Sequence, residues 1–341
     1  MALTAFERSP AAAAGTGREA SIEATGLTKS YGTVEAVRGI DLQVAAGELF
    51  GFLGPNGAGK STTIKILCTL LRPTAGSARV AGFDVVRERD EVRRHIGLVF
   101  QETTLDDYLT AEQNLRFHAD IYGMARTGVG SRIDAVLELV GLAERRASVV
   151  RTFSGGMKRR LEIARGLLHS PRVLFLDEPT IGLDPESRAT LWRYVDELRA
   201  AEDITVFLTT HYMDEAERCD RIAIIDEGQV GALDTPAALK GSVGHDRVRL
   251  QTSDDAAAEV LVRDRLGVDT IRQDGSLVVL VPDGEQFVPH LFEIGLPEAD
   301  VTIRSVSVAR PNLDDVFLAY TGSRLQDRQA AAARPGQGGP R

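Results

Sequence analysis

The sequence predicts an α/β fold built around a mostly parallel sheet with helices on both faces. Strands alternate with helices over the first two thirds of the chain, and segments such as "VLFL" at 173–176 are continuous apolar runs. Continuous apolar strands separated by helices are typical of parallel sheets that are buried on both faces. The turn "GPNGAGKST" at 54–62 joins an apolar strand to a helix, which fits a ligand site at the carboxyl edge of such a sheet.

Length and composition are those of a globular chain with room for more than one domain. The 341 residues are 43% hydrophobic and 26% charged, which allows one large domain and a smaller one. A net charge of −9 argues against a nucleic-acid partner. No window approaches about 18 consecutive apolar residues, so we expect no transmembrane helix. We expect Cys68 and Cys219 to be buried, reduced thiols and the run Lys158–Arg160 to be a solvated helix face.

The pattern predicts a first domain over residues 21–240, after a disordered tail at 1–20. Strands are expected at 21–32, 34–44, 47–54, 95–101, 172–179 and 204–211, with hairpins at 76–85 and 221–233. Helices are expected at 60–71, 186–201 and 212–219. From about 105 to 170 strands are missing, and amphipathic segments at 109–124, 131–142 and 157–168 predict a helical subdomain. Its first helix opens with a capping box of Thr110 and Gln113.

A second, smaller α+β domain is expected over residues 245–322, beyond a boundary at 234–246. Its predicted order is strand, helix, strand, strand, helix, strand, which is the ferredoxin-like pattern. An Asp274-Gly275 turn marks the hairpin in the middle of this order. A final helix follows at 312–322 with Asn312 as its cap, and residues 323–341 are expected to be a disordered tail.

The glycine-rich turn has the spacing of a phosphate-binding P-loop, Gly-x-x-x-x-Gly-Lys-Ser, between a predicted strand and a predicted helix. Glycines let backbone N–H groups approach phosphate oxygens, Lys60 supplies a charge to the β- and γ-phosphates, and the Ser61 hydroxyl is a ligand for Mg²⁺. The cofactors this predicts are ATP and Mg²⁺. The expected nucleotide-binding residues in this turn are Gly54, Pro55, Asn56, Gly57, Ala58, Gly59, Lys60, Ser61 and Thr62.

Polar residues at the ends of three other predicted strands complete a site for phosphoryl transfer. Asp177 ends "VLFLD" and is expected on the Mg²⁺ ion, and Glu178 follows it, poised to polarise an attacking water. Gln101 ends "GLVFQ" and is expected near Mg²⁺ and that water. His211 ends "VFLTTH" and is expected to hydrogen-bond the γ-phosphate. We therefore expect Glu178, His211 and Gln101 to be catalytic, and Ser61, Gln101 and Asp177 to be metal ligands.

The combined motifs resemble an ABC-type ATP-binding cassette over residues 22–238. They are "KSYG" with Tyr31, the P-loop, Gln101, "SGGM", "LFLDEPT", "GLDP" and His211, in the order typical of that family. The resemblance implies that Tyr31 stacks on adenine and that Glu178 is the general base. It also implies that the signature turn Ser154-Gly155-Gly156 reads the γ-phosphate bound by a second copy, and that Asp184 communicates across the dimer. The usual signature, Leu-Ser-Gly-Gly-Gln, has Phe153 and Met157 at its ends here.

The C-terminal stretch "SVARPNLDDVFLAYTG" narrows the resemblance to ATP-binding subunits of the daunorubicin-resistance type. That resemblance implies a head-to-tail homodimer and a separately encoded, multispanning permease. It places the chain on the cytoplasmic side of the cell membrane as a peripheral motor for export of a drug, antibiotic or lipid-like compound. Polysaccharide or another solute is an alternative cargo.

Two other classes of ABC protein fit the sequence less well. Ribosome-acting members resemble two cassettes in one chain, whereas this chain has one P-loop and one signature. DNA-acting members insert a long coiled coil between the P-loop and the acidic strand end. In this chain the corresponding segment, between Lys60 and Asp177, has short helices without sustained heptads. A non-catalytic regulatory cassette would lack Glu178 or His211, and both are present.

Overall fold

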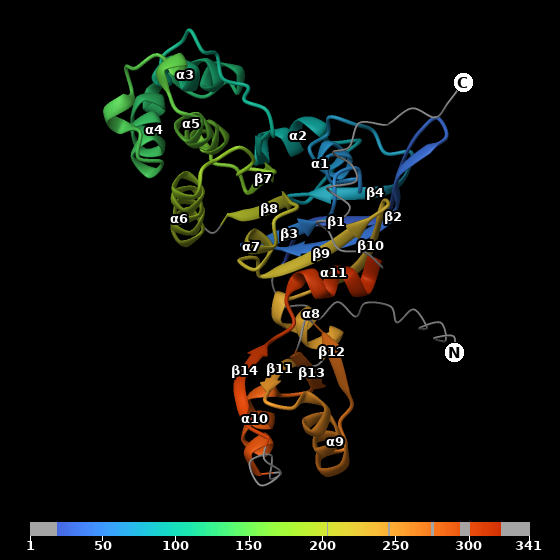
Figure 1. Ribbon diagram of the computed structural model, residues 1–341. Coiled ribbons are helices and arrows are strands. Elements are labelled where there is room, and N and C mark those ends of the chain that lie inside the picture. The colour runs from blue at the N-terminus through green and yellow to red at the C-terminus, as the bar shows by residue number, and fades with distance from the viewer. Residues whose placement is uncertain (1–18, 203, 245, 274–275, 294–300, 322–341) are drawn as a thin grey trace, which may run out of the picture. The chain divides into compact units, whose positions relative to one another are not determined.

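A computed structural model describes residues 19–202, 204–244, 246–273, 276–293 and 301–321. The chain divides into two compact units, with the first ending at Thr235 and the second beginning at Pro236. Figure 1 shows the helices and strands of both units, which are described separately below. The tails expected at 1–20 and 323–341 fall almost wholly outside the described residues, but Ala20 already begins the first strand, β1 (Ala20–Tyr31).

A six-stranded sheet forms the centre of the first unit, in the order β10-β9-β3-β8-β7-β6. Strands β3, β7 and β8 are buried along their whole length, and they pair in parallel with their neighbours β9 and β6. Only β10 runs antiparallel, as the second half of a hairpin with β9. The strand bounds are β3 Leu49–Leu53, β6 Ile96–Val99, β7 Val173–Asp177, β8 Thr205–Thr210, β9 Arg221–Asp226 and β10 Gln229–Asp234. The expected parallel sheet is thus confirmed.

Apolar side chains explain why these strands stay together. Phe50 on β3 stacks on Phe207 of β8 with ring centroids 5.5 Å apart, and Phe175 on β7 lies 5.5 Å from the same ring. All three side chains are fully buried. Each such side chain contributes roughly 1.5–3 kcal/mol when removed from water, so these contacts hold β3, β7 and β8 together.

A second, antiparallel sheet in this unit has the order β2-β1-β4-β5. Strands β1 and β2 (Val34–Ala45) form one long hairpin of 12 residues each, and their bounds lie within one residue of the strands expected at 21–32 and 34–44. Strands β4 (Ala75–Val80) and β5 (Phe83–Asp84) are the hairpin expected at 76–85.

Helices α1 (Lys60–Leu67), α2 (Arg89–His95), α6 (Pro185–Glu202) and α7 (Met213–Ala216) connect the strands of the first unit. Helix α1 ends four residues earlier than expected because Thr69 has a left-handed φ of 64°. Helix α7 has only four residues, half of the expected 212–219, because the chain turns back through Cys219 into β9.

The predicted helical subdomain contains three α-helices, grouped beyond the sheet in Figure 1. Helix α3 (Ala111–Ile121) begins with the expected capping box, in which Thr110 and Gln113 bond each other's backbone N–H. Helix α4 (Arg126–Leu139) is kinked at Thr127 and Gly128. Helix α5 (Gly155–Leu167) has Ser154 as its N-cap.

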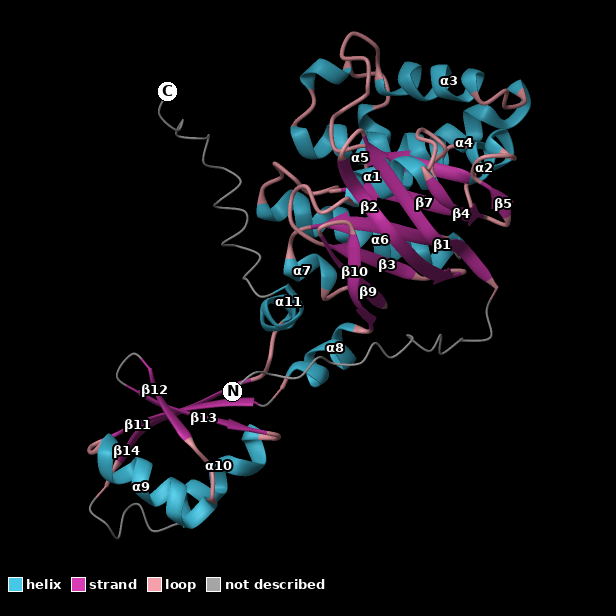
Figure 2. Cartoon of the chain, turned by 90° about the vertical axis from the view of Figure 1, so that its right-hand side faces the viewer, coloured by secondary structure: helices cyan, strands magenta, loops and turns pink. Residues whose placement is uncertain are grey.

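The second unit has a four-stranded antiparallel sheet in the order β12-β13-β11-β14. Helices α9 (Asp255–Leu266) and α10 (Gly284–Glu293) lie on the same face of that sheet (Figure 2). The strands are β11 Asp246–Thr252, β12 Thr270–Gln273, β13 Ser276–Val281 and β14 Ile303–Ala309. This order is the expected ferredoxin-like pattern, although the turn at Asp274-Gly275 lies outside the described residues.

Two further helices belong to the second unit. Helix α11 (Leu313–Thr321) is capped by Asn312, whose Oδ1 accepts from the Asp315 N–H at 2.9 Å. Helix α8 (Pro236–Val243) occupies the segment from which the sequence predicted only a domain boundary. Leu239 of α8 is buried, and one buried leucine in an eight-residue segment that also contains Gly241 and Ser242 is too weak a periodic signal to predict. Among the described residues of the whole chain, no helix is long and apolar enough to cross a membrane.

Candidate functional site

The glycine-rich turn follows β3 and leaves no room for side chains at two of its glycines. A Cβ on Gly54 would lie 2.3 Å from the Ile225 carbonyl oxygen, and one on Gly59 would lie 2.4 Å from that of Ala36. Gly59 also has φ 106°, which L side chains rarely adopt. Gly54 N–H donates to the Thr210 carbonyl at 3.2 Å, which ties the turn to β8. The backbone therefore takes the close-packed course that a phosphate cradle requires.

Lys60 is the first residue of α1, and its ammonium group lies inside the turn. Its Nζ donates to the carbonyl oxygens of Gly54 at 2.7 Å and Pro55 at 3.0 Å. The same Nζ lies 3.1 Å from Glu178 Oε1, and both side chains are more than 90% buried. Burial lowers the pKa of Lys60, and the carboxylates of Glu178 and Asp177 oppose that shift. A buried ammonium at this point provides a fixed positive charge for an anionic ligand.

Asp177 ends β7 and faces the Ser61 hydroxyl. Its Oδ1 accepts from Thr209 Oγ1 at 2.5 Å and lies 3.4 Å from Ser61 Oγ. A carboxylate and a hydroxyl at this separation are the oxygen donors that Mg²⁺ takes when phosphate oxygens and waters fill its other positions. The described residues contain no cluster of three or more acidic, histidine or cysteine side chains that could hold a metal alone. The site therefore fits a metal that arrives with a phosphate ligand.

Glu178 is buried beside Lys60 and has an unusual backbone. Its φ is 47°, in the left-handed region, and its N–H donates to both the carbonyl and the hydroxyl of Thr209. His211 Nδ1 lies 3.3 Å from Glu178 Oε1, although the orientation is not that of a hydrogen bond. Burial would raise the pKa of Glu178, but His211 and Lys60 outweigh it and hold that pKa below its ordinary value. The carboxylate is thus ionised and able to accept a proton.

Lys60, Ser61 and Glu178 line a cavity of about 310 Å³ at the carboxyl ends of the strands, whereas Asp177 and His211 are not among its lining residues. Gln101, which follows β6, and Thr62 of α1 also lie on its wall. The lining residues are Ala36, Asn56, Gly57, Gly59, Lys60, Ser61, Thr62, Gln101 and Glu178. Tyr31 does not line the cavity, but it is half exposed at the end of β1, in the same hairpin that contributes Ala36.

The second glycine-rich turn does not line this cavity. Ser154 is exposed, and its Oγ accepts from the Met157 N–H at 3.3 Å. A Cβ on Gly155 would meet no atom within 4 Å, so this helix N-terminus faces open space. Asp184 is also exposed, and its Oδ1 accepts from the Ser187 N–H at 2.9 Å in the first turn of α6.

The sequence interpretation was wrong about Arg159. The run Lys158–Arg160 was expected to be a solvated helix face, yet Arg159 is only 6% exposed. Its guanidinium donates to the carbonyl oxygens of Phe100, Asp177 and Pro179. The available signal was the spacing of Arg159 from Glu162 and Gly166, which places all three on one buried face of α5.

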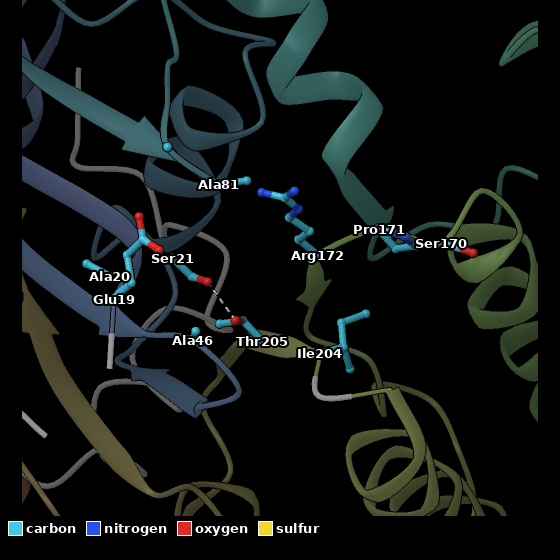
Figure 3. A pocket seen from close by; sticks show the side chains of 11 residues that line it. Glu19, Ala20, Ser21, Ala46, Ala81, Ser170, Pro171, Arg172, Ile204 and Thr205 are labelled. Carbon is cyan, nitrogen blue, oxygen red and sulfur yellow. Dashed lines mark hydrogen bonds between the residues drawn. The ribbon is translucent and has the colours of Figure 1, made fainter. Parts of the chain in front are cut away.

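A larger cavity of about 350 Å³ lies at the opposite, amino ends of β7 and β8 (Figure 3). Its wall includes Arg172 and Glu19, and Thr205 Oγ1 donates to Ser21 Oγ at 2.9 Å across it. None of the expected site residues lies there. Both cysteines, Cys68 and Cys219, are buried and unpaired, and burial raises the pKa of each thiol.

Comparison with known proteins identifies the family. The family model described as ABC transporter matches residues 37–181. The chain is 44% identical over 322 residues to the daunorubicin/doxorubicin resistance ATP-binding protein DrrA of Streptomyces peucetius, covering 92% of this chain and 96% of that protein. It is 38% identical over 315 residues to the linearmycin resistance ATP-binding protein LnrL of Bacillus subtilis, covering 90% and 100%.

Solved structures agree with the relatives. A post-hydrolysis ATP-binding cassette dimer bound to ADP and phosphate has a TM-score of 0.57 and 28% identity, covering 63% of this chain and 98% of that one. A dimeric bacterial ABC transporter cassette has a TM-score of 0.58 and 29% identity, covering 63% and 98%. The chain belongs to the ABC transporter family, as an ATP-binding subunit with ATPase activity.

Proposed function

We propose that this chain is the ATP-hydrolysing motor of an exporter and that ATP hydrolysis occurs in the 310 Å³ cavity. The observation that carries the proposal is the meeting of Lys60 and Glu178 on the wall of that cavity, 3.1 Å apart, with His211 Nδ1 3.3 Å from the same Glu178 oxygen. Phosphoryl transfer to water depends mainly on positioning and charge stabilisation, and this wall supplies fixed charges of both signs.

Lys60 and the P-loop hold the triphosphate. When the nucleotide binds, the Lys60 ammonium leaves the carbonyl oxygens of Gly54 and Pro55 and contacts oxygens of the β- and γ-phosphates. Backbone N–H groups of the turn bind the other phosphate oxygens. Ser61, Asp177 and Gln101 would hold Mg²⁺, which neutralises phosphate charge and polarises the P–O bond when it is bound. Asp177 is already oriented for this by Thr209.

Glu178 accepts the proton of the attacking water. Its lowered pKa keeps it ionised at neutral pH, and it lies 3.1 Å from Lys60 Nζ, the group that we propose binds the γ-phosphate. His211 donates to the γ-phosphate, and Gln101, which also lines the cavity, orients the water.

We infer that the complete site needs a second copy of the chain. Ser154 and Gly155 are exposed in one copy, while Gly156 packs against Ser187, and together they present a helix N-terminus, which favours phosphate oxygens. In a head-to-tail homodimer this turn contacts the γ-phosphate held by the P-loop of the other copy. Tyr31 then stacks on the adenine, and Asp184 lies where the two copies meet.

The partner of this motor is a membrane permease encoded separately, and the motor sits on the cytoplasmic face of the cell membrane. The relatives are named as ATP-binding proteins of drug and antibiotic resistance. Phe117 and Ile121 lie four residues apart on α3, and each is 63% exposed, while Tyr108 just before that helix is 81% exposed. Exposed apolar residues gathered on one helix mark an interaction surface, and we assign this one to the permease.

The cargo we propose is a drug, antibiotic or lipid-like molecule, because daunorubicin, doxorubicin and linearmycin appear in the names of the relatives. Export of polysaccharide or another solute is the alternative. The test co-expresses the chain with a candidate multispanning permease. ATP-dependent efflux of an anthracycline from cells that hold both proteins is expected, and stable association with ribosomes instead would contradict the proposal.

The catalytic assignment has its own test in Glu178→Gln. Replacing the base with an amide of the same shape should lower ATP turnover by about 10²–10⁴-fold and leave nucleotide binding in place. Turnover and the ATP dissociation constant are measured on the same preparation. Turnover near that of the wild type would remove Glu178 from this role.

A further inference from the structure

Helix α5 carries a buried arginine that none of the roles above uses. Arg159 Nε donates to the Pro179 carbonyl at 2.7 Å, Nη2 donates to the Asp177 carbonyl at 3.2 Å, and Nη1 donates to the Phe100 carbonyl. Nη1 also lies 3.0 Å from Glu162 Oε2, one turn further along the same helix. Glu162 is completely buried, so it supplies the countercharge that makes a buried guanidinium tolerable.

The three carbonyl groups that Arg159 binds belong to residues adjacent to two proposed catalytic side chains. Asp177 and Pro179 lie directly before and after Glu178, and Phe100 lies directly before Gln101. Glu178 has a φ of 47°, a conformation that a non-glycine residue keeps only when its surroundings determine it strongly. Bonds to the carbonyls on both sides of Glu178 are such a constraint.

The same helix also holds the chain after Gln101. Glu162 Oε1 accepts from the Thr104 N–H at 2.7 Å. Arg165 Nη1 donates to the Thr104 carbonyl at 3.1 Å, and Nη2 donates to its Oγ1 at 2.5 Å. The loop that contains Gln101 is therefore fixed to α5 at both of its ends, by Arg159 at Phe100 and by Glu162 and Arg165 at Thr104.

We propose that Arg159 is a positioning residue for ATP hydrolysis, which fixes Glu178 and Gln101 relative to the helix that begins at Ser154. This inference rests on the proposed function of those two side chains. A guanidinium reaches three carbonyl groups because its five donors lie in one rigid plane, whereas an ammonium on a flexible stem is a single point. A displacement of α5 by the phosphate contact at Ser154 therefore moves the backbone of the base in the same chain.

The test is Arg159→Lys, with Arg160→Lys as the matched control. Arg160 is the next residue on α5 and also bonds backbone carbonyls, those of Val140 and Gly141, but these are remote from Glu178 and Gln101. Arg159→Lys should lower kcat by about 10–100-fold through misplacement of the base. The ATP dissociation constant should stay within about twofold of the wild type, because the P-loop contacts are untouched. Arg160→Lys should leave both quantities unchanged.

The outcomes separate this inference from the proposed function. A wild-type chain that hydrolyses no ATP overturns the proposed function and this inference with it. An active wild type whose Arg159→Lys variant keeps kcat within about twofold, or loses ATP binding in proportion to kcat, overturns this inference alone.

If Arg159→Lys does not fold, as judged by its thermal melting curve, Thr104→Val is the second variant. It removes only the hydroxyl that Arg165 bonds, from an exposed residue. A kcat lowered by about 3-fold at unchanged ATP affinity supports positioning from α5, and an unchanged kcat overturns it.

Discussion

Two glycine-rich turns begin helices in the same unit, and they differ in how completely their own chain surrounds them. The turn before α1 is enclosed: a Cβ on Gly54 or Gly59 would collide with backbone, and Lys60 is bonded and buried. The turn before α5 is open, with Gly155 facing empty space and Ser154 exposed. Both have the N–H groups and the dipole that attract phosphate.

The difference shows that an anion site needs more than a helix N-terminus. The first turn has a fixed lysine, an acidic strand end and a cavity beside it. The second has only its backbone and one hydroxyl, and on the function proposed above it becomes a site when a second copy brings the remaining groups to it. Variants of the two turns should therefore fail in different ways.

The largest effect is expected from Lys60→Ala. Removal of the buried charge should lower nucleotide affinity or turnover by at least about 10³-fold, because no other cation lines the cavity among the described residues. Lys65→Ala, on the exposed side of the same helix, is the control and should behave like the wild type. ATP binding is measured by titration and turnover by phosphate release. A Lys60→Ala variant with full activity would remove the P-loop assignment.

Gly155→Asp should have the next largest effect, and it should lower turnover without lowering ATP binding by a single copy. A side chain fits there because a Cβ meets nothing within 4 Å, so the fold and ATP binding by a single copy should be retained. The added carboxylate repels the γ-phosphate of the partner copy, and turnover should fall by about 10²-fold. Gly130→Asp on α4, equally open, is the control. Loss of ATP binding by the monomeric Gly155→Asp variant contradicts a contact made across the dimer.

Met157→Gln introduces the residue that usually ends the signature motif, and it tests whether that position affects the second turn. The amide adds one polar contact next to a turn that already has Ser154, so we expect turnover to change by no more than about threefold. The apparent ATP affinity of the dimer is the quantity to measure. A change of about tenfold or more in either direction would show that Met157, rather than the Ser-Gly-Gly core, limits the second turn.

The smallest effect is expected from Glu112 on α3, which belongs to the same helical subdomain as the second turn. Hydrogen bonds from Arg146 and Arg116 lower the pKa of Glu112 from its ordinary value of 4.5 to about 2. Because the folded pKa lies below the unfolded one, this interaction stabilises the folded chain fully above pH 4.5 and is lost as the pH falls towards 2. Since the pair is partly exposed, Glu112→Gln should lower the melting temperature by only about 1–3 °C at pH 7.

That difference should shrink between pH 5 and the acid limit, where the wild type loses the same interaction. Glu138→Gln on the exposed face of α4 controls for removing a negative charge. A melting difference that is constant with pH would mean that Glu112 stabilises the fold by something other than its charge.

Much of the nucleotide site could be predicted because its residues follow strands that are easy to recognise. The P-loop and Asp177 each stand at the end of an apolar run, and parallel strands bring such ends to one edge. The hydrogen bonds from Arg159 to backbone carbonyls could not be predicted in the same way. Its partners are backbone carbonyls at the ends of β6 and β7, and neither their positions nor their need for a donor is visible in the residue types.

The ends of the helices could likewise be predicted only where the signal is local. The capping box at Thr110 is a local signal and was confirmed. The end of α1 depends on the left-handed backbone at Thr69, and that conformation is held by contacts such as the Arg93 side chain on the Thr69 hydroxyl. Such contacts come from distant parts of the chain and leave no local pattern.

The pairing of β3 has a consequence for biosynthesis. Leu49–Leu53 pairs with Thr205–Thr210 on one side and with Arg221–Asp226 on the other. At about 5–20 residues per second, the ribosome needs roughly 8–30 s after making β3 to produce the first of these partners. During that interval the strand that leads into the P-loop is apolar and unpaired, whereas the helices of the helical subdomain are built from local contacts. The nascent chain is therefore most exposed to aggregation at its nucleotide-binding strand, and slow elongation or low temperature should lengthen its dependence on chaperones.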